Sequence, residues 1–231
     1  MPVYNAPLQR VDAKETRRYA GLMKAKGFDE ALIEEACEDA LLLAVPKGVW
    51  QVYDYDCELR EVKSDPPCIL RGEKIGKHLA GCDKVILLSA TVGEDIEETV
   101  TKRFQRGEYA SSVLLDAAAT TAVEQIADEM EKAIRPKAAA KGYRMRWRFS
   151  PGYGDWPMEQ QPEVVRLSHA GEIGISLSES FMLVPRKSIT AIIGLYKEDV
   201  SEGASGNDGE HAPRGCAACS RKDCPSRRMG G

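Results

Sequence analysis

The chain has 231 residues, of which 43% are apolar and 29% are charged, as in an ordinary globular protein with one core and an appendage. Its formal net charge of -4 gives no indication of a nucleic-acid partner. It has no apolar run long enough to cross a membrane, no signal-peptide pattern at its N-terminus, and an odd number of cysteines, seven. These features argue against a disulfide framework and predict a cytoplasmic protein with reduced thiols.

The first part of the chain predicts two helices followed by a strand. Asp12-Ala-Lys-Glu15 resembles a capping box, so a helix is expected to begin there and to end near Gly27. Asp29 can cap the next helix, which Pro46 ends. Residues 48–59 are rich in Val, Trp and Tyr and favour a strand.

The next part predicts alternating strands and helices. Residues 68–70 favour a short strand, and residues 71–80 favour a helix that carries the lone His78, interpreted as a surface or satisfied histidine. The apolar run 84–93 is typical of a buried strand, and a helix is expected from about Asp95. The run lacks the glycine-rich pattern of a phosphate-binding loop.

Residues 111–134 form the longest helical pattern in the sequence. Glu124 falls on the flank of its apolar stripe, with Thr121 and Asp128 on the same side. Glu124 is a solvated acid by default. It gains importance only if the loop that carries Arg148 packs nearby.

The segment Tyr143–Tyr153 is the centre of the functional hypothesis. Apolar and arginine side chains alternate from Tyr143 to Phe149, which predicts a strand with one apolar and one cationic face. Ser150-Pro-Gly152 ends it, and Arg148 is the last arginine before that turn. The simplest interpretation is a half-exposed antiparallel strand, and the alternative is a site at the strand end.

The last part of the folded region predicts a helix over residues 162–170 and two strands. Alternation over residues 174–181 places Glu179 among apolar neighbours, where an acid should find a partner or face a pocket. Residues 188–196 are apolar on both faces, which indicates a central strand.

The C-terminal region changes composition. Residues 201–215 are rich in Gly, Ser, Glu, Asn and Asp, which predicts a flexible linker, and residues 216–231 form a tail with Cys216, Cys219 and Cys224. These cysteines have the spacing of zinc or iron-sulfur ligands, with His211 as a fourth zinc ligand. The other interpretation is a disordered tail with loose thiols.

Two segments together resemble one known family. Arg148-Phe-Ser-Pro-Gly-Tyr153 and the ordered segment from Gly174 to Ser188 resemble the activation (reactivation) domain of cobalamin-dependent methionine synthase, over about residues 41–197. The resemblance implies one α+β domain, residues 1–200, with a twisted, mainly antiparallel sheet and packed helices. The chain lacks the large modules of the full enzyme, so it resembles a stand-alone form of the domain that acts in trans.

The resemblance also implies a function and a set of site residues. The family binds S-adenosylmethionine and restores methylcobalamin from inactive cobalt(II), with one electron from a flavodoxin or ferredoxin. The implied partner is the cobalamin-binding module of a methionine synthase or of another corrinoid protein. Arg148 would hold the ligand's carboxylate, with Glu124 at its amino group. The other implied site residues are Pro151, Gly152, Tyr153, Glu179 and Ser180.

One departure from the family pattern motivates an alternative. Ala191–Gly194 stands where the family has an aromatic pair that contacts the ligand, so the adenosine contacts are expected to differ. The alternative function is a metal- or cluster-bearing electron-transfer or docking protein for a corrinoid enzyme, with a vestigial S-adenosylmethionine site. It depends on Cys216, Cys219 and Cys224.

Overall fold

The computed structural model describes residues 3–25 and 28–197. The predicted linker, the tail with Cys216, Cys219 and Cys224, and His211 lie outside these residues. Within them, no helix is both long and apolar enough to span a membrane. The same residues hold no group of three or more His, Cys, Asp or Glu side chains arranged to bind a metal ion.

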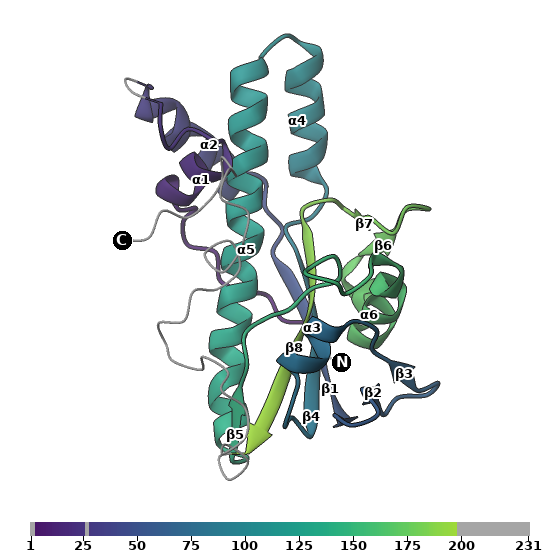
Figure 1. Cartoon of the computed structure of the whole chain (residues 1–231). Coiled ribbons are helices and arrows are strands. Elements are labelled where there is room, and N and C mark those ends of the chain that lie inside the picture. The colour runs from purple at the N-terminus through teal and green to yellow at the C-terminus, as the bar shows by residue number, and fades with distance from the viewer. Residues whose placement is uncertain (1–2, 26–27, 198–231) are drawn as a thin grey trace.

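The centre of the molecule is a six-stranded antiparallel sheet with the order β3-β2-β1-β4-β8-β5 (Figure 1). A separate hairpin pairs β6 with β7. The strands are β1 (Lys47–Asp56), β2 (Glu61–Val62), β3 (Cys68–Ile69), β4 (Lys84–Thr91), β5 (Tyr143–Met145), β6 (Ser176–Leu177), β7 (Leu183–Val184) and β8 (Ser188–Lys197).

Helices cover both faces of this sheet, so the α+β, mainly antiparallel prediction is confirmed (Figure 1). The α-helices are α1 (Ala13–Tyr19), α2 (Glu30–Leu43), α3 (Glu73–His78), α4 (Asp95–Gln105), α5 (Tyr109–Ala139) and α6 (Gln161–Ser168), with short 3-10 turns at Met158–Gln160 and Ala170–Ile173.

Alternate residues of the central strands enter two separate cores. From β4, Ile86 and Leu88 pack into the core formed with α1, α2, α4 and α5. Val85 and Leu87, from the same strand, pack into the core formed with α3 and α6. Because β4 and β8 are buried on both faces, their near-continuous apolar sequences are explained, and the prediction that residues 188–196 form a central strand is confirmed.

The helix α5 is the longest helix of the described chain, with 31 residues and Pro136 in its last turn. Its buried face packs on β4, β8, α1, α2 and α4. In Figure 1 the α4–α5 hairpin projects beyond the sheet, while the C-terminal half of α5 runs alongside it. This helix therefore connects most parts of the larger core and presents one flank to the candidate site.

Three local predictions were wrong. The strand expected from Tyr143 to Phe149 is regular only over β5, because the next pairing with β8, Phe149 with Ile192, is shifted by one residue from the β5 register. Arg146, expected on a solvated face, is buried instead: Nη2 donates to the carbonyl of Ala80 (3.0 Å) and the guanidinium lies over the ring of Tyr196. The strand expected over residues 174–181 is reduced to β6, since the chain turns there and residue 181 has a φ of +63°. The first helix ends at Tyr19, well before Gly27.

Candidate functional site

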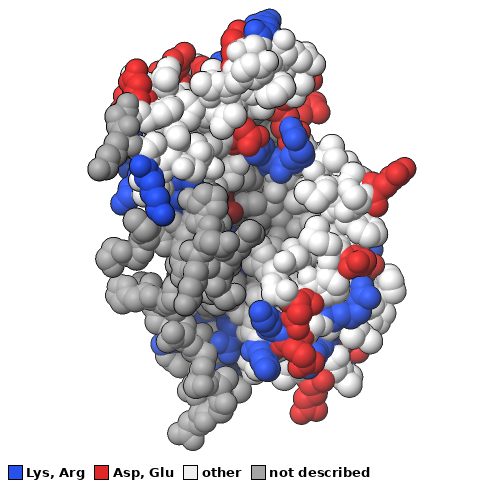
Figure 2. All heavy atoms as spheres, turned by 45° about the horizontal axis from the view of Figure 1, so that its top comes forward, with Lys and Arg blue, Asp and Glu red and all other residues white. Residues whose placement is uncertain are grey.

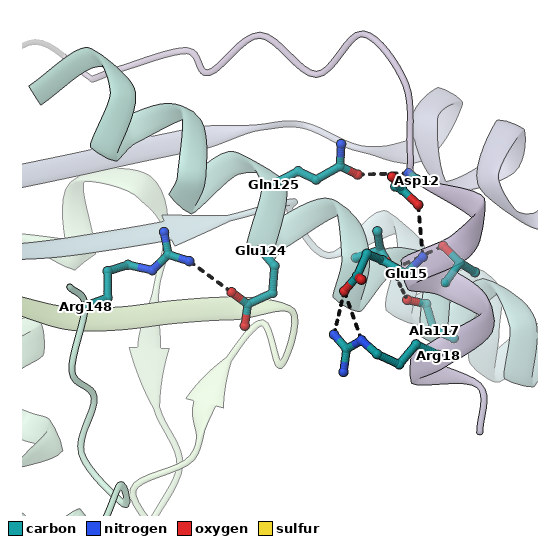
Figure 3. Close-up of polar contacts among 9 residues, drawn as sticks. Asp12, Glu15, Arg18, Ala117, Glu124, Gln125 and Arg148 are labelled. Carbon is teal, nitrogen blue, oxygen red and sulfur yellow. Dashed lines mark hydrogen bonds and ion pairs between the residues drawn. The ribbon is translucent and has the colours of Figure 1, made fainter. Parts of the chain in front are cut away.

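The backbone around Arg148 is fixed by β8, although β5 has already ended. Phe149 exchanges two backbone hydrogen bonds with Ile192, its N–H donating at 2.9 Å and its carbonyl accepting at 2.8 Å. Residue 148 is therefore held against the central strand of the sheet. Its side chain extends to α5, as Figure 3 shows for Arg148 and Glu124.

Three carboxylates of α5 surround the Arg148 guanidinium. Nη2 lies 3.2 Å from Glu124 Oε2 and 2.8 Å from Asp128 Oδ1, and Nη1 lies 2.8 Å from Glu131 Oε1. The positions i, i+4 and i+7 share one helix face, which explains how one arginine reaches all three. Figure 3 shows the contact with Glu124. The sequence analysis gave Glu124 a role only if the loop with Arg148 packs nearby, and the two side chains are in contact.

The electrostatics of this cluster follow from its burial. The Arg148 side chain is 17% exposed and that of Glu131 is 11% exposed. Burial by itself lowers the pKa of Arg148, but the three carboxylates outweigh that effect and its pKa is raised. Arg148 is charged at every physiological pH. Since one guanidinium faces three acids, the cluster carries an excess of negative charge.

This cluster lines a cavity of about 560 Å³. Of the site residues predicted from the sequence, Arg148, Glu124, Pro151 and Tyr153 line it. The face shown in Figure 2 carries interspersed basic and acidic side chains, without an extended area of one sign among the described residues. Glu124 of α5 and three residues of the segment 148–153 thus converge on one cavity.

Gly152 does not line the cavity. It has a φ of +86°, a conformation that favours glycine, and a Cβ there would lie 2.8 Å from the sulfur of Met158. Gly152 is therefore required for the local turn, which places its neighbours Pro151 and Tyr153 on the cavity. A ligand contact of its own stays a prediction.

Glu179 and Ser180 are exposed in the β6–β7 hairpin and do not line the cavity. Ser180 pairs its hydroxyl with that of Ser178 at 3.1 Å, an arrangement within the turn. Phe181 and Met182, which follow them, do line the cavity. The implied site roles of Glu179 and Ser180 therefore stay predictions.

Several lining residues were missed by the sequence analysis. Glu131 was recoverable, because it continues the α5 spacing of Glu124 and Asp128. Arg18 and Tyr19 come from α1, which had been assigned no chemistry, and no local pattern distinguishes them. The polar floor comes from β8 and α6, where Gln161 Nε2 donates to Thr190 Oγ1 at 2.6 Å.

The other basic side chains of the lining are each paired with an acid. Arg18 pairs with Glu15 at 2.7 Å, and Lys132 pairs with Glu129 at 2.6 Å. The two remaining pairs are Arg135 with Glu131 at 3.9 Å and Arg186 with Glu97 at 3.5 Å. Arg135 offsets part of the negative charge of the Arg148 cluster, because its partner Glu131 belongs to that cluster, and the other three basic groups pair with acids outside it.

Ala191–Gly194, where the sequence departs from the family pattern, lies inside the sheet. Ala191, Ile192 and Ile193 are fully buried. A Cβ on Gly194 would lie 2.6 Å from Cys82 Sγ and 2.9 Å from Leu79 Cδ2. None of the four lines the cavity, so this segment belongs to the core.

A second hollow of about 520 Å³ lies beside α6 and is lined by Arg166, His169 and Glu172 among others. His169 Nδ1 lies 3.2 Å from Glu172 Oε1, and Arg166 pairs with Glu163 at 2.7 Å. These side chains are largely exposed. The predicted lone histidine, His78, is satisfied elsewhere: its Nε2 lies 2.9 Å from the carbonyl of Trp147.

Comparison with known proteins supports the fold. No protein-family model and no curated protein matches the chain. Among solved structures, it is similar to one described as the crystal structure of the MetH reactivation domain bound to AdoHcy, with a TM-score of 0.59 and 14% sequence identity. The match covers 86% of this chain and 79% of that chain. At this identity the similarity shows a shared fold.

Proposed function

We propose that the chain binds S-adenosylmethionine in the Arg148 cavity and presents its methyl group to a cobalamin-dependent methyltransferase on another chain. The fold shared with a MetH reactivation domain supports this proposal, as do the motif residues Arg148, Pro151 and Tyr153 on one cavity. The sequence resemblance and the structural similarity point to the same kind of domain.

The observation that carries the proposal is the charge pattern of the cavity. S-adenosylmethionine has one carboxylate and two cationic centres, its ammonium and its sulfonium. Arg148 faces three carboxylates, of which Glu131 also pairs with Arg135, so the cluster offers a cation to the ligand carboxylate and acids to its cationic centres. Charge-assisted hydrogen bonds in a partly buried site are stronger than neutral ones, so this complementarity favours such a ligand over a neutral nucleoside.

Binding requires an exchange of partners at Arg148. The ligand carboxylate takes one edge of the guanidinium, and an acid released from that edge pairs with the ligand ammonium. Glu124 and Asp128 are the acids for this exchange, since both are more exposed than Glu131. Glu131 stays behind Arg148 and holds its orientation. The chain thereby positions the sulfonium methyl without taking a covalent part in the transfer.

The proposed partner carries the corrin and its chemistry. One electron from a flavodoxin or ferredoxin reduces the partner's cobalt(II), and transfer of the sulfonium methyl then restores methylcobalamin, leaving S-adenosylhomocysteine. The alternative, a metal- or cluster-bearing electron-transfer protein, depends on Cys216, Cys219 and Cys224, outside the described residues. Metal analysis and visible absorbance of anaerobically purified protein test that alternative separately.

The direct test is calorimetric titration of S-adenosylmethionine. The wild type is expected to bind, and Arg148→Met should weaken binding at least about 30-fold, because charge-assisted hydrogen bonds contribute roughly 2 kcal/mol. Arg148→Lys keeps the positive charge but loses the bidentate geometry of the guanidinium, so its affinity should lie between those of the wild type and Arg148→Met. Arg144→Met, an exposed arginine of β5, is the matched control and should bind normally.

A functional assay follows from the binding test. The protein is mixed with a methionine synthase that lacks its own reactivation domain, in the cobalt(II) state, together with a reductant and S-adenosylmethionine. Recovery of methylcobalamin with wild type and Arg144→Met, but not with Arg148→Met, is expected. Absence of ligand binding by the wild type would overturn the proposal.

A further inference from the structure

The N-terminal helix α1 is fixed to the same flank of α5 that carries the Arg148 cluster. The backbone N–H of Asp12 donates to Gln125 Oε1 at 3.0 Å (Figure 3). The Thr16 hydroxyl donates to Thr121 Oγ1 at 3.1 Å. Thr121 precedes Glu124 by three residues, which is roughly 5 Å along a helix. The anchor of α1 therefore lies about one turn from the first acid that holds Arg148.

At its C-terminal end, α1 presents Arg18 and Tyr19 to the cavity. Arg18 is 3% exposed and donates to Glu15 Oε2 from Nε at 2.9 Å and from Nη2 at 2.7 Å. Its guanidinium carbon lies 3.9 Å from the centroid of the Tyr19 ring. The ring is therefore backed on one face by a buried cation, which fixes its orientation.

Two other rings on the cavity, Trp147 and Tyr153, belong to an aromatic cluster on the sheet side, and Phe181 lines the opposite, β7 side. Trp147 packs against His78 and Phe149, with centroids 4.4 and 5.3 Å apart. Tyr153 makes an edge contact with Phe149 at 5.9 Å. Tyr19 lies outside this cluster, on the wall that α1 forms. The segment Ala191–Gly194 supplies no ring at all.

We propose that α1 forms the adenine-binding wall of the cavity, with the Tyr19 ring stacked on the base and Arg18 behind it. This rests on the proposed binding of S-adenosylmethionine and names the residues for the half of the ligand that Arg148 does not reach. In Figure 3 Glu124 lies between Arg148 and Arg18, and Glu124 and Tyr19 line the same cavity, so a ligand held at Arg148 and Glu124 has α1 within the cavity it occupies. A planar purine has the shape that a backed aromatic ring accepts.

Two fragments of the ligand separate this role from that of Arg148. 5′-Methylthioadenosine carries the nucleoside without the amino acid, and S-methylmethionine carries the sulfonium amino acid without the nucleoside. Each is titrated by calorimetry into wild type, Tyr19→Leu and Tyr19→Trp. Tyr109→Leu, an exposed tyrosine at the start of α5 and outside the cavity, is the control. Thermal unfolding of each ligand-free variant checks that it is folded.

Tyr19→Leu is expected to weaken S-adenosylmethionine and 5′-methylthioadenosine roughly 5- to 150-fold, the range for losing one stacked base. Affinity for S-methylmethionine should stay the same. Tyr19→Trp should bind the nucleoside at least as tightly as wild type, because its ring is larger; a purely structural role for Tyr19 would instead make this variant weaker.

The two proposals fail in different ways. If wild type binds neither S-adenosylmethionine nor either fragment, the proposed function is wrong. If wild type binds S-adenosylmethionine but Tyr19→Leu leaves the nucleoside affinity unchanged, or weakens both fragments equally, the α1 wall is wrong and the function stands. If Tyr19→Leu does not fold, the titration of Tyr19→Trp alone tests the α1 wall. A loss of 5′-methylthioadenosine affinity in Tyr19→Trp would then overturn that proposal.

Discussion

Two cavities of the described chain have similar volumes, about 560 and 520 Å³, but the charged side chains that line them differ in exposure. In the first, Arg148 and Glu131 are 17% and 11% exposed. In the second, His169 and Glu172 are 47% and 39% exposed. Removing charge from water is costly unless the groups are paired, whereas exposed pairs contribute little. Burial of charge, and not cavity size, therefore distinguishes the candidate site.

The largest effect is expected at Arg148 itself. Arg148→Met leaves three acids facing one another, so the free energy of unfolding at pH 7 should fall by about 2 to 4 kcal/mol. Urea denaturation measures this loss. Near pH 4 the deficit should shrink, because the repelling carboxylates become protonated without their cation.

Arg144→Met is the control for that measurement and should change the unfolding free energy little, since Arg144 is exposed. The loss of unfolding free energy in Arg148→Met could instead be no larger than in the control, or could be independent of pH. Either result would show that the three carboxylates do not repel one another measurably without Arg148, and would remove the contrast between the two cavities.

A buried thiol tests the same rule away from both cavities. Burial raises the pKa of Cys82 to about 11, above its ordinary value of 9.0, against a smaller opposing effect of Arg146. The neutral thiol is favoured in the folded state, so its stabilising contribution is complete below pH 9 and is lost as the pH rises through 11. Roughly 3 kcal/mol of unfolding free energy should be lost over that interval.

Urea midpoints between pH 8 and 11 measure the alkaline loss. Cys82→Ala should be less stable at pH 8 but should show a shallower decline, because the titrating group is gone. Cys57→Ser, at an exposed position, should keep the wild-type slope. Equal slopes in all three proteins would mean that the burial of Cys82 does not contribute to the alkaline transition.

The smallest effect is expected in the second hollow. The hydrogen bond from His169 is the main cause that lowers the pKa of Glu172, so its contribution to stability is present at neutral pH and lost in acid. Because both side chains are largely exposed, Glu172→Gln should leave the urea midpoint and S-adenosylmethionine affinity within error of wild type. A clear loss of ligand affinity would move the candidate site to this hollow.

Much of the framework was predictable because it depends on local periodicity. The helix α5 and the strand β8 have strong apolar patterns, and both were located within a few residues. The edge segment after β5 was not, since the inward turn of Arg146 depends on the carbonyl of Ala80 and the ring of Tyr196. An alternating pattern alone cannot distinguish a solvated arginine from one that finds buried partners.

The candidate site was predictable only in part for the same reason. Arg148, Glu124, Pro151 and Tyr153 were named from motifs, and all four reach the cavity. The contribution of α1 depends on contacts such as Asp12 with Gln125, which are separated by 113 positions in sequence. The sequence of residues 12–19 gives no sign of that contact, so the local sequence pattern could not place Tyr19 on the cavity wall.

The tight packing around Gly194 limits how this protein can be redesigned. Transplanting the family's aromatic pair into β8 would force side chains against Cys82 and Leu79 and push the central strand away from α3. Such a variant should fold and express poorly, so that no change in ligand preference could be measured. Efforts to alter selectivity have a freer choice at Met182, which is exposed and lines the cavity outside the six-stranded sheet.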